Sequence, residues 1–197
     1  MMVDLSTIPP GWERGLMAAE NVNERLRRAT RALDEAGVPY AVVGGNAVSE
    51  WVARVDPGAT RYTKDVDILM DRTDFDAFRS ALESAGFEYH HVYGVDCFID
   101  GPNGRPSEGV HLLFAGEKLK PSDIQELPTL EESERAFEFQ VVSLEGITRM
   151  KLMAWRDKDR THLRDMIGVG LIDPAWPARF PPPLDARLQQ LLDDPNG

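Results

Sequence analysis

The sequence predicts an α/β (α+β) fold, in which helices flank a small mixed β-sheet. Three observations carry this prediction: an amphipathic helical pattern near the start, a short apolar strand pattern that ends at a glycine pair, and a second apolar strand pattern that holds two aspartates. The length of 197 residues and the composition, 42% hydrophobic and 28% charged, suit one globular domain with short appendages.

The first part of the chain alternates helix and strand. Residues 20–36 place apolar side chains four and three positions apart, as on one face of a helix, and Gly37 is a typical residue to end it. Residues 40–43 predict a short buried strand, and residues 46–55 predict a helix that opens directly after the glycine pair. Strand and helix are therefore expected to meet at a tight turn.

The next part predicts three more strands and one helix. Residues 61–70 have the apolar pattern of a strand, and the helix that follows is expected to be capped by Thr73 and ended by Gly86. Residues 87–100 and 109–116 predict two further strands, joined by a loop rich in glycine and proline.

The C-terminal part is expected to be mostly helical. Residues 119–132 are polar and irregular, residues 137–143 predict a short strand, and residues 144–170 have a helical pattern, as one helix or two. Five prolines between residues 174 and 183 mark a linker. Residues 184–194 predict a short terminal helix, docked on the body or on a partner.

The domain boundaries follow from this order of elements. One domain is expected over residues 1–173, with a core at about 38–118 and a helical C-terminal part at about 143–170. Residues 174–197 then form a proline-rich linker and a short terminal helix. No internal repeat divides the chain further.

Bulk properties exclude several classes of protein. No apolar run approaches the ~20 residues that cross a bilayer, so no membrane partner is expected. The first residues lack the basic and apolar regions of a secretory signal, and Cys97 is the only cysteine, which excludes an intrachain disulfide. A cytoplasmic location follows by default. The formal net charge of −11 argues against a general nucleic-acid coating protein.

Asp65 and Asp67 form a D-x-D motif on the second strand pattern. Residues two apart on a strand share a face, so Val66 and Ile68 are expected in the core and the two carboxylates together on the other side. Such like charges repel, and a divalent cation such as Mg²⁺ would remove the repulsion. Alternatively, both carboxylates lie on the solvated face of an edge strand and have no function.

Gly44 and Gly45 lie between the first strand and the helix after it. Without side chains, this turn lets a phosphate reach the backbone N–H groups and the positive end of the helix. The alternative is a tight turn that serves geometry only. No G-K-[ST] follows, so the turn is not a P-loop. If the two strands are neighbours, a phosphate site at the turn and the carboxylate pair would meet.

A cationic segment lies in the helical region. On one continuous helix, Lys151, Trp155, Lys158 and His162 would share a face, because their spacing is four, three and four. Most cations of this segment are expected on a solvated face, balanced by its acidic residues. Lys151 is the exception, since it is a lone cation in the apolar stretch MKLMA. Trp155 is expected to pack rather than to stack on a base.

Together, three blocks of sequence resemble a known superfamily. VVGGNA at residues 42–47, RYTKDVDIL at residues 61–69 and KLMAWRDKDRTHLRD at residues 151–165 are similar, in this order, to the signature of the nucleotidyltransferase superfamily of the DNA polymerase β type. The third block resembles its small bacterial members, which include the type IV toxin nucleotidyltransferases of toxin–antitoxin systems. The resemblance spans residues 41–165.

This resemblance implies a nucleotidyltransferase-like fold and a metal-dependent transfer of a nucleoside monophosphate from a nucleoside triphosphate to a hydroxyl acceptor. Asp65 and Asp67 would be catalytic metal ligands for Mg²⁺, with Mn²⁺ as the other candidate ion. Lys151 would be catalytic, at a phosphate or near the attacking hydroxyl. Five residues would bind the nucleotide: Gly44, Gly45, Thr63, Lys64 and Lys158.

The third carboxylate of that superfamily is missing from the strand that normally carries it. The strand GVHLLF has His111 instead, which would either ligate the metal or merely occupy the position. As a ligand, an imidazole suits zinc or manganese better than magnesium. The sequence shows no group that would orient the imidazole, which favours the second role. The alternative sources of an oxygen ligand are Asp96, Asp100 and Glu108.

Two other functions stay open. A catalytically degraded nucleotidyltransferase-fold module would bind a nucleotide or a protein partner without transfer. A D-x-D nucleotide-sugar glycosyltransferase would hold a metal on a diphosphate. Within the transferase hypothesis the acceptor is open as well: an RNA end, a protein, or a small hydroxylated molecule such as an antibiotic.

Overall fold

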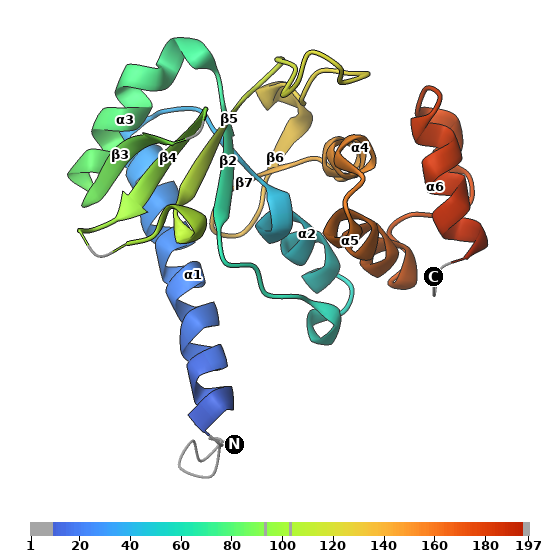
Figure 1. Ribbon diagram of the computed structural model, residues 1–197, viewed down its shortest axis with the longest axis horizontal. Coiled ribbons are helices and arrows are strands. Elements are labelled where there is room, and N and C mark those ends of the chain that lie inside the picture. Colours follow the sequence, from blue (N-terminus) through green and yellow to red (C-terminus); the bar gives the residue numbers. More distant parts are fainter. Residues whose placement is uncertain (1–9, 93, 103, 195–197) are drawn as a thin grey trace.

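In the computed structural model, which describes residues 10–92, 94–102 and 104–194, seven strands form one mixed β-sheet (Figure 1). Their order across the sheet is β3-β4-β5-β2-β1-β7-β6. The strands are β1 Ala41–Val43, β2 Val66–Met70, β3 Phe87–Val92, β4 Val95–Asp100, β5 Val110–Phe114, β6 Ser133–Arg135 and β7 Gln140–Val142. The predicted fold class, a mixed sheet flanked by helices, is confirmed.

Strand β2 lies in the middle of the sheet, not at an edge. It pairs antiparallel with β1 and parallel with β5, and all its apolar residues are fully buried. Cross-strand partners form a row over four adjacent strands: Val43 lies opposite Asp67, Asp67 opposite His111, and His111 opposite Cys97. The solvated edge strand that was the alternative for the D-x-D motif is therefore wrong.

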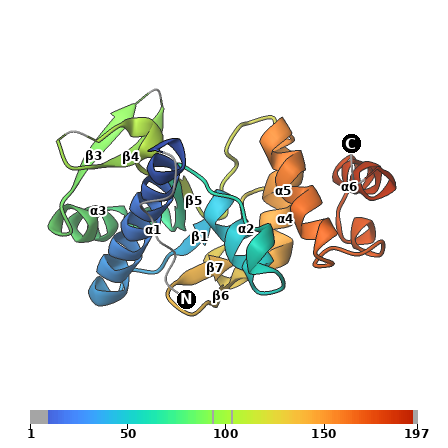
Figure 2. The same cartoon turned by 90° about the horizontal axis from the view of Figure 1, so that it is seen from below.

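Six α-helices flank the sheet in the described part of the chain: α1 Pro10–Ala36, α2 Gly44–Ala53, α3 Phe75–Ser84, α4 Leu144–Ala154, α5 Asp157–Gly168 and α6 Leu184–Asp193. Helices α1 and α3 pack together beside β3, β4 and β5, whereas α2, α4, α5 and α6 gather on the side of β1 and β7 (Figures 1 and 2). The buried stripe of α1, with Val22, Leu26, Ala29 and Leu33, follows the predicted spacing, whereas Ala36, predicted on the same face, is exposed at the end of the helix.

Three helix starts differ from the predicted ones. Helix α1 begins at Pro10 rather than at residue 20, and proline is favoured at a first helical position. Helix α2 begins at Gly44, so the glycine pair forms its first turn instead of a loop before it. Asp74 rather than Thr73 precedes α3, because Thr73 belongs to a short 3-10 turn over Arg72–Asp74.

Residues 144–170 form two helices. Trp155 adopts a left-handed conformation with a φ of 50°, which ends α4 and lets α5 start in a new direction. The face predicted for one continuous helix is therefore wrong, since Lys151 and Lys158 belong to different helices. The strand predicted at residues 137–143 is shorter, β7, and pairs with β6, whose three residues are too few to give a sequence pattern.

The predicted terminal helix is present as α6 and docks on the body. Its Leu184, Leu188 and Leu191 are buried, and the helix packs against α4 and α5. Residues 1–9 and 195–197 of the predicted domain and terminal segment lie outside the described residues. None of the helices among the described residues has the length and apolar character needed to cross a bilayer.

Candidate functional site

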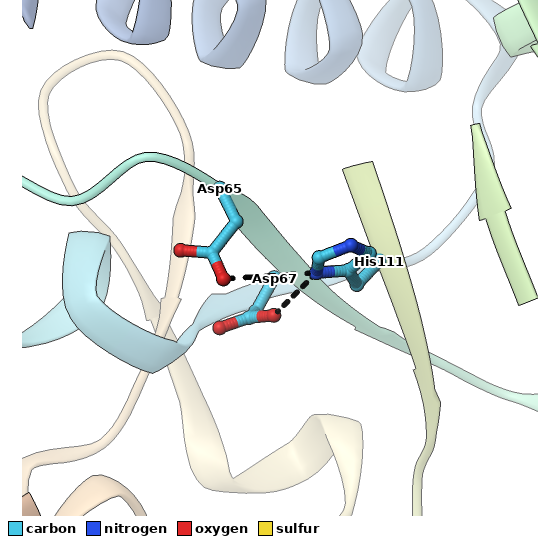
Figure 3. A group of neighbouring side chains, drawn as sticks. All are labelled: Asp65, Asp67 and His111. Atoms are coloured by element: carbon cyan, nitrogen blue, oxygen red, sulfur yellow. Dashed lines mark ion pairs between the residues drawn. The ribbon is translucent and has the colours of Figure 1, made fainter. Parts of the chain in front are cut away.

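Asp65, Asp67 and His111 form a cluster at the start of β2 and β5, two neighbouring strands in the middle of the sheet order (Figure 3). Asp65 directly precedes β2, Asp67 is its second residue, and His111 lies opposite Asp67 on the neighbouring parallel strand β5. Each side chain offers one ligand atom, and these atoms all lie within 4.8 Å of one another. All three side chains are partly buried, which places the cluster at the wall of a cavity.

The ring of His111 is oriented by a backbone carbonyl. Its Nε2 lies 2.7 Å from the carbonyl oxygen of Pro106, which can only accept a hydrogen bond, so Nε2 carries a proton. Its Nδ1 then faces the carboxylates, 3.5 Å from Oδ1 of Asp67 and 3.8 Å from Oδ2 of Asp65. The expectation that nothing orients this imidazole is wrong, because the Pro106 carbonyl does so. Pro106 lies in the connection between β4 and β5, whose position the sequence pattern does not reveal.

A lone pair on Nδ1 facing two carboxylates is unfavourable unless a proton or a cation lies between them. The contact with Asp67, opposed by burial, raises the pKa of His111 above its ordinary value. A metal ion would relieve the same repulsion, since an ion ~2.1 Å from each ligand holds the ligand atoms on the order of 3 Å apart. The donor set therefore fits a divalent cation, held by two carboxylates and one imidazole.

Asp65 is held in place by two neighbours. Thr63 donates a hydrogen bond from Oγ1 to its carboxylate at 2.5 Å, and the buried Asn46 donates from Nδ2 to its backbone carbonyl at 2.9 Å. Burial opposes ionisation, but the Thr63 hydrogen bond, its own backbone N–H and the charge of Lys158 keep the pKa of Asp65 below its ordinary value. Asn46 was not singled out from the sequence, although it directly follows the glycine pair.

The glycine turn touches the cluster. Gly44 has a φ of +67°, and a side-chain carbon there would lie 1.9 Å from Oδ2 of Asp67. Only glycine allows this approach. A side-chain carbon on Gly45 would instead meet Thr63 at 3.0 Å. No described side chain caps the first turn of α2, so its N–H groups remain for an anionic ligand.

Lys151 is buried beside Asp159, an aspartate expected on the solvated face of the cationic segment. Its Nζ lies 3.2 Å from Oδ1 of the fully buried Asp159, and Arg156 Nε donates to Oδ2 of the same carboxylate at 2.7 Å. Burial lowers the pKa of Lys151, and the negative charges of Asp159 and Asp67 oppose this shift. Burial also opposes ionisation of Asp159, but Arg156 and Lys151 keep its pKa below its ordinary value.

One cavity of about 630 Å³ connects these groups. Six of the predicted site residues line it: Gly44, Asp65, Asp67, His111, Lys151 and the exposed Lys158. Three predicted nucleotide-binding residues do not: Gly45, Thr63 and the exposed Lys64. The cavity wall also includes residues that sequence reasoning missed, chiefly Asp159 and Arg156.

The other candidates for a third carboxylate lie elsewhere. Cys97 faces His111, so the alternation of β4 turns Asp96 and Asp100 to the opposite face of the sheet. There Asp96 is held by Tyr89 and His91, and Asp100 pairs with two arginines of α1. Glu108 lines a separate cavity. Among the described residues, His111 is therefore the third group of the cluster.

The fold was compared with those of known proteins. No protein-family model and no curated protein matches the chain. Solved structures do: ANT(2'')-Ia in complex with adenylyl-2''-tobramycin superimposes with a TM-score of 0.58 at 18% identity, over 88% of this chain and 99% of that one. A Helicobacter pylori protein assigned to the nucleotidyltransferases gives a TM-score of 0.53 at 16% identity, over 90% and 78% of the two chains.

An antigenic nucleotidyltransferase-like protein from Paracoccidioides brasiliensis gives a TM-score of 0.52 at 19% identity, over 90% of both chains. The chain has a nucleotidyltransferase fold. The resemblance deduced from three short blocks of sequence is thus confirmed at the level of the fold. In this nucleotidyltransferase fold, the cluster of Asp65, Asp67 and His111 is one that could hold a metal ion.

Proposed function

We propose that the chain is a metal-dependent nucleotidyltransferase, which moves a nucleoside monophosphate from a nucleoside triphosphate to a hydroxyl acceptor. The observation that carries this proposal is that the Asp65–Asp67–His111 cluster, the Gly44 turn and Lys151 line one cavity of a nucleotidyltransferase fold. Two neighbouring, partly buried carboxylates at the start of a central strand are costly without a compensating positive charge.

The residues of the cluster would hold the divalent cation, which supplies Lewis-acid stabilisation of the charge on phosphate oxygens. The uncapped first turn of α2 offers N–H groups to a phosphate, and Lys151 and Lys158 add positive charge at the same cavity. The net reaction joins the acceptor oxygen to the α-phosphorus and breaks the bond from that phosphorus to the bridging oxygen. Pyrophosphate leaves, and the hydroxyl proton passes to water.

Mn²⁺ is the ion that this ligand set favours, with Mg²⁺ as the alternative. Imidazole nitrogen suits manganese better than magnesium, which prefers oxygen ligands. The hydrogen bond to Pro106 keeps the proton on Nε2 of His111 and directs Nδ1 to the carboxylates. This second partner supports a ligand role for His111 rather than that of a bystander.

Calorimetric titration with a non-hydrolysable nucleoside triphosphate analogue, with and without Mn²⁺, tests the proposal. Asp67→Asn is expected to weaken metal-dependent binding by about tenfold or more, which corresponds to about 1.4 kcal/mol. Asp96→Asn is the matched control, because this carboxylate lies on the opposite face of the sheet. Nucleotide affinity that is the same in Mn²⁺ and in a chelator would contradict the proposal.

A second candidate function is a nucleotide-binding module without transferase activity. One observation favours it: His111 lies where the resemblance leads us to expect a third carboxylate. This candidate predicts metal-dependent nucleotide binding but no pyrophosphate release with any acceptor. The glycosyltransferase alternative rests on the D-x-D motif alone, and the nucleotidyltransferase fold argues against it.

Among the possible acceptors, we favour a small hydroxylated molecule. ANT(2'')-Ia was solved with adenylyl-2''-tobramycin, which is a small molecule bearing an adenylyl group. The net charge of −11 disfavours an RNA end, since binding of nucleic acid phosphates needs a basic surface. A protein acceptor would have to bring a hydroxyl into the cavity.

A further inference from the structure

We propose that the acceptor is a hydroxylated molecule with an apolar body, not a polycation, and that this body occupies the β4 side of the cavity. We call that part the apolar lobe, defined by Val95 and Cys97 of β4 and by Leu119, which lines the same cavity. The inference rests on the proposed nucleotidyl transfer and adds the chemical class of its acceptor.

The β4 part of the apolar lobe and the glycine turn lie on opposite sides of the candidate metal ligands. The row of cross-strand partners runs from Val43, next to Gly44, through Asp67 and His111 to Cys97. Adjacent strands lie ~4.8 Å apart, so the lobe begins two strands away from Asp67, on the side opposite to the turn. In an in-line displacement the attacking oxygen approaches opposite the leaving phosphate. With the triphosphate at Gly44, the attack comes from the lobe.

The side chains of the lobe are ones that a ligand would cover. Val95 and Leu119 are 47% and 61% exposed although they line a cavity. Outside the lobe, Met150 and Met153 of α4 line the same cavity, and methionine adapts its shape to irregular apolar partners. Apolar side chains gathered around a cavity with a few polar groups at one end are the usual lining of a small-molecule site.

The cavity leaves at most one carboxylate, that of Asp123, for a polycation. Of its four aspartates, two belong to the metal cluster, and Asp159 is buried between Lys151 and Arg156. Asp123 already accepts a hydrogen bond from the backbone N–H of Lys120 at 2.8 Å. Four cations line the same cavity: Lys120, Lys151, Arg156 and Lys158. An acceptor with several ammonium groups would meet these cations with a partner for at most one of its own charges.

Two glucosides that share their free hydroxyl groups isolate the effect of an apolar body. Phenyl β-glucoside and methyl β-glucoside differ only in the group on the anomeric oxygen. Ligand-observed NMR titration of the full chain with Mg²⁺ and α,β-methylene-ATP gives the Kd of each, with tobramycin as the polycationic probe. We expect phenyl glucoside to bind about tenfold more tightly than methyl glucoside, because its ring buries apolar surface.

Substitutions in the lobe test where the ring lies. Val95→Asp and Leu119→Asp change exposed side chains, so the fold is expected to survive both. Each should remove most of the preference for phenyl glucoside and leave the affinity for α,β-methylene-ATP unchanged. Phe137→Asp is the matched control: it replaces an apolar side chain that is 97% exposed and lies outside the cavity, and it should keep the preference.

The outcomes separate this inference from the proposed function. Equal Kd values for the two glucosides, tighter binding of tobramycin, or an unchanged preference in both lobe variants would overturn the apolar acceptor while leaving nucleotidyl transfer in place. Failure of the parent protein to bind α,β-methylene-ATP with Mg²⁺ or Mn²⁺ would overturn the proposed function instead, and the acceptor role of the lobe with it.

Discussion

Gly44 and Asp67 are in direct contact: a side-chain carbon on Gly44 would lie 1.9 Å from Oδ2 of Asp67. The turn that was predicted to receive a phosphate and the carboxylate that was predicted to bind a metal are thus parts of one structure. This contact joins the end of β1 to the second residue of β2. A change at the glycine should therefore act on the metal site without altering any charged group.

Gly44→Ala is expected to displace the Asp67 carboxylate and to weaken Mn²⁺ binding by about tenfold or more. The matched control is Gly37→Ala, because Gly37 has nearly the same φ, +66°, but nothing within 4 Å of the added carbon. Both variants carry the cost of a left-handed residue, about 1–2 kcal/mol in the free energy of unfolding. Only Gly44→Ala should also change the Kd for Mn²⁺, measured by calorimetry. Equal losses of metal affinity in the two variants would show that the contact with Asp67 is irrelevant.

His111 would give the proposed metal site a dependence on pH. A metal ion and a proton would compete for Nδ1, and the contact with Asp67 raises the pKa of His111 in the absence of metal. Mn²⁺ affinity is therefore expected to fall as the pH decreases, and the fall should begin above about 6.5, the ordinary value for histidine. Calorimetric titration between pH 6 and pH 8.5 measures it.

His111→Asp separates the two roles of this residue. If Nδ1 is a ligand, the variant should bind Mg²⁺ more tightly relative to Mn²⁺, since a carboxylate replaces the imidazole, and the pH dependence in this range should disappear. His111→Ala should weaken both ions. Metal affinities that are unchanged in both variants would make His111 a bystander.

Asp159 is expected to support Lys151 within the cavity wall. It is fully buried and contacts both Lys151 and Arg156, so Asp159→Asn leaves a buried cation without its charged partner. Breaking a buried pair in this way costs about 3–5 kcal/mol in the free energy of unfolding. Asp157→Asn is the control, because the Asp157 side chain is 92% exposed and should change stability by at most about 0.5 kcal/mol. Urea denaturation measures both variants.

The sequence located the parts of the site whose signals are local. The glycine pair, the D-x-D motif and Lys151 each stand out against an apolar background, and strand alternation places the two aspartates together. The groups that contact these residues come from other elements of the fold. His111, for example, is bonded by the backbone carbonyl of Pro106, and a pattern of side chains cannot predict a contact with a backbone carbonyl. Their roles in binding and catalysis remain predictions.

Asp159 was missed for a different reason. Within the run of alternating charges at residues 156–160, nothing in the pattern distinguishes Asp159 from Asp157. The left-handed Trp155 decides between them, because it starts α5 at a new angle and turns its third residue toward Lys151. For a bulky side chain such a conformation is rare, so a continuous helix was the natural expectation.

His162 lies on α5, and its Nδ1 is buried without a hydrogen-bond partner among the described residues. Burial, with the charge of Lys151 adding to it, lowers the pKa of His162 to about 4. Above pH 6.5 the ring is neutral in both the folded and the unfolded chain and has no effect on stability. As the pH falls from 6.5 to about 4, only the unfolded chain gains a proton, so the free energy of unfolding decreases.

The loss associated with this one group is at most about 3 kcal/mol. His162→Gln removes the titration and should flatten the stability profile between pH 6.5 and pH 4.5, as measured by urea denaturation at each pH. Carboxylates also titrate in this range, so the informative quantity is the difference between variant and parent protein. His90→Gln changes an exposed histidine and serves as the control. If the His162→Gln and His90→Gln profiles both run parallel to that of the parent, the buried ring is not the origin of the acid sensitivity.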